Sequence, residues 1–121
     1  MGFDQDKATH HFILAADGGN IEVSANDASD QDSRDQIRAH LKEIAGEFAR
    51  GSFARPLATH NELPPGVRGM QQRQKAIVYQ YEDTTNGGRV RISTADRKAI
   101  AAIHEFLRYQ IREHATGDPV K

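Results

Sequence analysis

Apolar and polar residues alternate in two short segments near the N-terminus, residues 11–16 and 21–25. Alternation with a period of two is typical of strands that have one buried face. The segment between them, Asp17-Gly18-Gly19-Asn20, is rich in residues that adopt the positive φ of tight turns at low cost. This pattern predicts a β-hairpin.

The same pattern returns in the second half of the chain. Residues 76–82 and 89–94 alternate in the same way and flank Asn86-Gly87-Gly88. We therefore expect a second β-hairpin, in which Glu82 lies opposite Arg91 if Asn86-Gly87 forms the turn.

Two longer segments repeat apolar residues every three or four positions, which is the spacing of one face of an α-helix. The first follows a polar stretch at residues 26–33 and ends at Arg50-Gly51, as expected for a capped helix that glycine terminates. The second covers residues 96–114. Residues 52–74 contain three prolines and two glycines and predict a crossover loop, and residues 115–121 predict a tail. The apolar positions of the two helices are Ile37, Leu41, Ile44 and Phe48, and then Ile100, Ile103, Leu107 and Ile111.

The order ββαββα contains an internal repeat. Residues 18–24 match residues 87–93 at an offset of 69, because in each copy a double glycine leads into a strand of the same parity. An offset close to 64 aligns the helices and places His40 beside His104. A matched hairpin followed by a matched helix is typical of a duplicated unit.

The predicted fold is α+β in one domain. Two ββα units, residues 8–51 and 76–117, would form a four-stranded antiparallel sheet with two helices on one face. The other face would be solvated or would pair with a second copy in a homodimer. The larger residues expected on that face are Ile13, Val78, Arg89 and Arg91.

Composition limits the classes of function. The chain has 121 residues and no Cys, which excludes disulfides, iron–sulfur clusters and thiol nucleophiles. Its longest apolar run, residues 12–16, is far shorter than the ~20 residues that span a bilayer, so no membrane insertion is expected. Neither double glycine continues as a phosphate-binding loop, which leaves no nucleotide cofactor. The net charge is −5 over residues 1–50 and +4 over residues 51–121, which is too weak a split to favour nucleic-acid binding.

Three of the six histidines face the predicted interface between sheet and helices. In the first hairpin His10 has the parity of the buried residues, whereas His11 points away. His40 and His104 lie inside the apolar stripes of the helices. Neutral imidazoles from different elements are ligands for zinc and copper, so His10, His40 and His104 form a predicted metal site. Additional ligands would come from His11, His60, His114, Met1 and Met70, with the methionines as thioether ligands for Cu(I).

The same residues fit other functions. In one alternative the histidines only pack, and a groove beside residues 60–70 takes a small molecule or a peptide without catalysis. In another, His40 or His104 acts as the general base of an enzyme. The pattern favours a histidine-rich metal-binding protein that is not an enzyme, with a small-molecule or protein interaction domain as the alternative.

A resemblance over nearly the whole chain rests on these segments: Met1-Gly2-Phe3-Asp4, Thr9-His10-His11-Phe12, Gly18-Gly19-Asn20-Ile21-Glu22-Val23, residues 33–41, Pro64-Pro65-Gly66-Val67 and residues 104–119. In them the chain is similar to a family of small bacterial proteins of uncharacterised activity. Many relatives begin with an export signal, so the resemblance implies a periplasmic location. No such signal precedes Met1 here, which leaves open a mature form from which it has been removed or a cytoplasmic variant. Some relatives carry the name aspartate carbamoyltransferase, whose two α/β domains a chain of 121 residues cannot hold.

Overall fold

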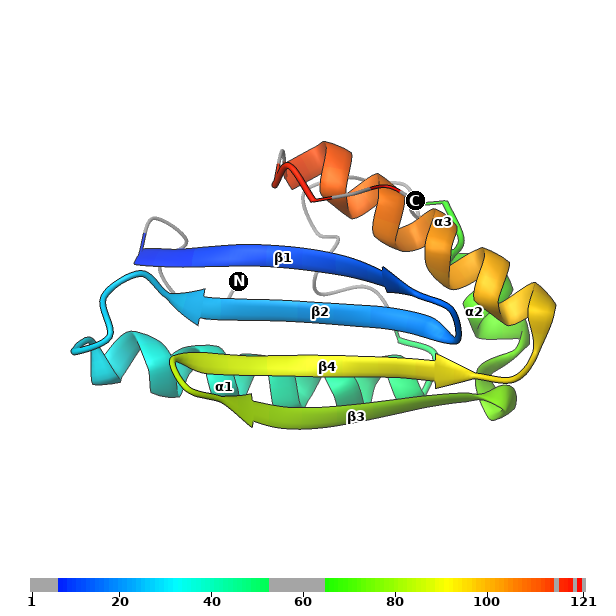
Figure 1. Cartoon of the computed structure of the whole chain (residues 1–121). Helices are drawn as coiled ribbons and strands as arrows, with labels where there is room; N and C mark the ends of the chain where they lie inside the picture. Colours follow the sequence, from blue (N-terminus) through cyan, green and yellow to red (C-terminus); the bar gives the residue numbers. More distant parts are fainter. Residues whose placement is uncertain (1–6, 53–64, 115, 119, 121) are drawn as a thin grey trace.

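A computed structural model describes residues 7–52, 65–114, 116–118 and 120. The four strands form one antiparallel sheet in the order β1-β2-β4-β3 (Figure 1). This confirms the predicted α+β fold and its ββαββα order, to which the structure adds a short helix. The elements are β1 (Ala8–Ala15), β2 (Gly18–Ala25), α1 (Gln31–Ala49), α2 (Val67–Gln72), the 3-10 helix η3 (Gln74–Ala76), β3 (Ile77–Thr84), β4 (Gly87–Thr94) and α3 (Arg97–His114).

The sheet has a local two-fold axis between its central strands. Gly18 of β2 pairs with Ser93 of β4, and Ser24 pairs with Gly87, so that residues 69 apart exchange places across the ladder. Two further backbone hydrogen bonds, each with an N···O distance of 2.9 Å, follow the same symmetry. The N–H of Thr94 donates to Asp17 O, and the N–H of Ala25 donates to Asn86 O. The strand repeat at an offset of 69 therefore corresponds to a symmetry of the sheet.

The helices repeat at an offset of 66. Both begin after an aspartate whose carboxylate accepts the backbone N–H three residues on, which satisfies one of the free donors of the first turn. Both contacts measure 3.1 Å: Ser33 N to Asp30 and Ala99 N to Asp96.

The buried positions of the helices give the same offset. Ile37 and Leu41 of α1 correspond to Ile103 and Leu107 of α3, and all four are at most 1% exposed. At this offset the equivalent of His40 is Phe106. The prediction that His40 and His104 are equivalent is therefore wrong by two residues, because the loops between strand and helix differ in length.

Each helix packs over the hairpin of the other unit. α1 lies across β4 and β3, whereas α3 packs mainly on β1 and β2 (Figure 1). The core forms between the sheet and these two helices. Its largest fully buried side chains include Phe48, Phe106, Ile92 and Met70.

Both hairpin turns lie two residues or fewer from the predicted positions. Ala15 pairs with Gly18 and Thr84 pairs with Gly87, so Ala16-Asp17 and Thr85-Asn86 form the turns and all four glycines belong to strands. The predicted pairing of Glu82 with Arg91 is consequently wrong. Glu82 lies opposite Arg89, and their side chains are 3.3 Å apart.

The segment predicted as a crossover loop, residues 52–74, contains α2 and the first residue of η3. Gly66, with φ of 87°, precedes α2, and a Cβ at this position would lie 2.2 Å from Ala102 O of α3. Val67 and Met70 are buried, so this short helix contributes to the core. Residues 53–64 of the predicted loop lie outside the described residues. None of the helices in the described part of the chain combines the length and apolar composition needed to cross a membrane.

The face of the sheet away from the helices carries the residues predicted for it. Ile13 is 38% exposed and Val78 is 52% exposed. Between them Arg89 lies within 3.8 Å of Glu22 and 3.3 Å of Glu82. Exposed ion pairs of this kind contribute little to stability. With two exposed apolar residues and these charged ones, the face is a mixed surface. A homodimer through it remains a prediction.

Candidate functional site

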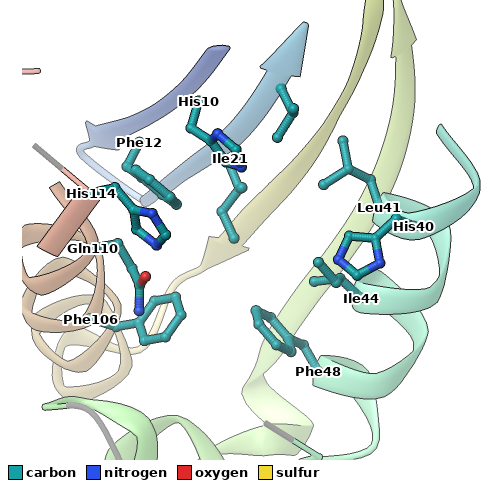
Figure 2. A pocket seen from close by; sticks show the side chains of 11 residues that line it. His10, Phe12, Ile21, His40, Leu41, Ile44, Phe48, Phe106, Gln110 and His114 are labelled. Atoms are coloured by element: carbon teal, nitrogen blue, oxygen red, sulfur yellow. The ribbon is translucent and has the colours of Figure 1, made fainter. Parts of the chain in front are cut away.

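A cavity of about 40 Å³ lies between the sheet, α1 and α3 (Figure 2). Most of its lining is apolar, with four polar side chains among eleven. The lining residues are His10, Phe12, Ile21, Val23, His40, Leu41, Ile44, Phe48, Phe106, Gln110 and His114.

Two histidines and a phenylalanine form one wall of the cavity. The rings of His10 and His114 are stacked with centroids 5.6 Å apart and planes inclined by 10°. Phe12 stacks against both, at 5.5 Å from His114 and 6.4 Å from His10. His114 is the last residue of α3 and is exposed, so this wall lies where the cavity meets solvent. Figure 2 shows His40 on the opposite side, on α1.

Burial holds the imidazoles of this wall in the neutral form. The pKa of His10 is lowered to about 4, first by desolvation and then by the neighbouring His114, His11 and His40. Desolvation also lowers the pKa of His114, against the opposing effect of Glu113. At neutral pH this wall of the cavity therefore presents uncharged imidazoles.

The lowered pKa of His10 predicts a pH dependence of stability. The unfolded chain binds a proton at His10 below about pH 6.5, whereas the folded chain binds it only below about 4. The unfolded state binds more protons in this window, so stability should rise from pH 4.5 to pH 6.5, by roughly 1 to 2 kcal/mol after allowance for solvent screening.

Urea unfolding at pH 4.5, 5.5 and 6.5 would measure this slope, and His10→Gln should reduce it. The carboxylates of lowered pKa, such as Asp96 and Asp118, lose their contribution at lower pH and do not obscure the window. A variant slope equal to that of the wild type would show that His10 is not held neutral by the fold.

Gln110 is the most informative polar residue of the cavity. It lies on α3, is 6% exposed, and directs its carboxamide into the space between Phe106 and His114 (Figure 2). Its Nε2 has no hydrogen-bond partner among the described residues. An unsatisfied buried amide costs about 1 to 3 kcal/mol, so this group reduces the stability of the ligand-free protein.

In the internal repeat, most equivalents of the polar lining residues are apolar. Each of the four polar positions has an aromatic or aliphatic residue as its equivalent in the other unit. The pairs are His10 with Tyr79, His40 with Phe106, Gln110 with Ile44, and His114 with Phe48. Each equivalent pair around this core therefore combines one histidine or glutamine with one aromatic or aliphatic residue.

His104, predicted as a metal ligand, anchors α3 to the first hairpin. Its Nε2 donates to the carbonyl of Ala15 at 2.7 Å. The equivalent residue of α1, Arg38, donates to Thr84 O at 2.8 Å, and Thr84 is the equivalent of Ala15. The two hydrogen bonds are equivalent in the repeat, and each connects a helix to the hairpin of the other unit. His104 therefore has a structural role and does not join His10 and His40 in the cavity.

The other predicted ligands are dispersed. His11 points away from the helices, and its Nδ1 lies 2.9 Å from Asp118. Met70 is buried on α2 and does not line the cavity. Met1 and His60 fall outside the described residues. Within residues 7–52, 65–114, 116–118 and 120, no three or more His, Asp or Glu side chains are grouped so that they could hold a metal ion.

Prediction from the sequence thus places His10 and His40 at the cavity, treats His114 as an additional residue, and misses Gln110. An offset of 66 would have aligned Gln110 with Ile44 and revealed a polar residue in a core position. Comparisons of the chain with known protein families, with curated proteins and with solved structures find no match.

Proposed function

We propose that this protein is a non-catalytic binding domain that takes a small molecule into the cavity between β1, β2, α1 and α3. The observation that carries the proposal is the buried carboxamide of Gln110, whose Nε2 has no partner among the described residues. Ligand pockets combine an apolar lining with a few polar groups that fix orientation, and this cavity has that composition. The equivalent Ile44 shows that an apolar residue suits the fold at this position.

The first test is the stability of Gln110→Met, which keeps the length of the side chain and removes its amide. We expect the melting temperature of the ligand-free protein to rise by roughly 3 °C, because a desolvated amide without a partner is removed. Gln80→Met, on the exposed part of β3, is the matched control and should change it little. A lower melting temperature for Gln110→Met would mean that the protein itself satisfies the amide, and it would overturn the proposal.

The second test asks whether the cavity admits a guest. Xenon occupies apolar cavities of proteins without specific contacts. Under xenon pressure, the methyl resonances of Ile21, Leu41 and Ile44 should shift, whereas those of Val67, which is buried elsewhere, should not. Unchanged resonances at the cavity would show that it is closed to ligands.

A third test concerns the metal site predicted from the sequence. Native mass spectrometry of the untagged chain with Zn(II), Cu(II) or Cu(I) should show no stoichiometric retention, because the described His, Asp and Glu side chains form no group of three. Stoichiometric retention that His10→Gln abolishes would favour a metal centre over the small-molecule site. The periplasmic location implied by the family resemblance stays a prediction.

A further inference from the structure

The charges around the cavity restrict its ligand. Among the eleven lining side chains that the structure describes there is no Lys, Arg, Asp or Glu. A charged group placed here would lose its hydration without a counter-ion, which is costly in an apolar site. His10, whose pKa burial lowers to about 4, is neutral at physiological pH and supplies no positive charge. The cavity therefore selects against carboxylates and ammonium groups.

The volume of the cavity sets the size of the buried part. A cavity needs roughly 10 to 15 Å³ to hold one water molecule, and about 40 Å³ is present. This accommodates roughly three or four non-hydrogen atoms. The remainder of a larger ligand would extend past the rings of His10 and His114 to the solvent.

The free hydrogen-bonding group sets the chemistry of the buried part. The Nε2 of Gln110 is a donor, so its partner must be an acceptor. Ile44, Phe48 and Phe106 line the same space and leave little room for a strongly hydrated group. An uncharged carbonyl oxygen on a short apolar end meets both requirements.

We infer that the cavity binds the end of an uncharged carbonyl compound, such as a ketone or an amide, with the carbonyl oxygen accepting from Gln110. This inference rests on the proposed function and adds the chemical class of the ligand. It assigns Gln110 the role of the residue that distinguishes a carbonyl from a hydrocarbon of the same shape.

Five planar probes of four non-hydrogen atoms test it at pH 7: acetone, acetamide, acetate, acetamidinium and isobutene. Chemical-shift titration of the cavity methyl groups gives each affinity. We expect acetone and acetamide to bind at least tenfold more tightly than acetate and acetamidinium, and several-fold more tightly than isobutene. Gln110→Met should remove about tenfold of the acetone affinity and little of the isobutene affinity, whereas Gln80→Met should leave both unchanged.

The outcomes separate the two proposals. If isobutene binds as well as acetone, or if an ion binds best, the cavity is a binding site but the carbonyl inference is wrong. If none of the five probes binds at tens of millimolar while xenon enters, the carbonyl inference fails, but the cavity is still accessible to a guest. If xenon is also excluded, the proposed function fails as well.

Discussion

Replacing Gly18 or Gly87 with alanine is expected to destabilise the protein by at least about 3 kcal/mol. The two glycines are equivalent in the repeat and face each other's strand across the centre of the sheet. A Cβ on Gly18 would lie 2.1 Å from Ile92 O, and one on Gly87 would lie 2.0 Å from Val23 O. Both contacts are with backbone, which cannot move aside without breaking the β2–β4 ladder. Gly18 also has φ of 146°, a conformation that alanine rarely adopts.

Urea unfolding followed by circular dichroism would measure these losses, with Gly46→Ala as the matched control. Gly46 lies inside α1, and a Cβ at this position would have the movable end of Arg50, at 3.3 Å, as its nearest neighbour. Because glycine costs about 1 kcal/mol in a helix interior, this control should be neutral or stabilising. A loss of less than about 1 kcal/mol for both Gly18→Ala and Gly87→Ala would mean that the central strands approach each other less closely.

These glycines also explain where prediction of the strands fails. Gly-Gly next to Asn or Asp is typical of a tight turn, and both hairpins are predicted around such a sequence. The structure uses the glycines inside strands, and at Gly18 and Gly87 the paired backbone of the neighbouring strand leaves no room for a Cβ. A contact with a strand 69 residues away leaves no local signal in the sequence. The period-two alternation and the helical spacing are sufficient to predict the strands and both long helices.

The short helix α2 escapes prediction for a different reason. Pro65 and Gly66 are strong breaking signals, and only Val67 and Met70 of the six helical residues are buried. Such a short segment does not form a helix by itself, since nucleation is unfavourable. Its packing against α3, with Gly66 close to the backbone of that helix, stabilises it.

At the candidate site, strand parity and helical spacing correctly predict which histidines face the interface. The alignment of the two repeat units, in contrast, is predicted with the wrong offset. His10 and His40 face the interface as expected. His104 is predicted to join them, because an offset of 64 makes it the equivalent of His40. At the observed offset of 66 it is the equivalent of Arg38 instead, and both side chains bind a carbonyl at the end of the opposite hairpin.

The second large effect is expected for Phe106→Ala. Phe106 is 1% exposed, packs edge-on against Phe48 at 5.9 Å and lines the cavity. Truncating a buried phenylalanine costs about 3 to 5 kcal/mol, because a transfer free energy is lost and a void remains. Here the void adjoins an existing cavity, so the combined space should accept a whole benzene ring, which is too large for the original 40 Å³.

Benzene should therefore raise the melting temperature of Phe106→Ala by several degrees and that of the wild type by much less, since a ligand that binds only the folded state stabilises it by mass action. Ile103→Ala is the matched control, because Ile103 is fully buried on the same helix and does not line the cavity. It should lose about 2 to 5 kcal/mol without comparable recovery. Recovery confined to Phe106→Ala would show that the cavity and the space left by the Phe106 ring are continuous. An equal rise in the melting temperature of both variants would mean that benzene fills any void in this core. The cavity would then not be a distinct binding site.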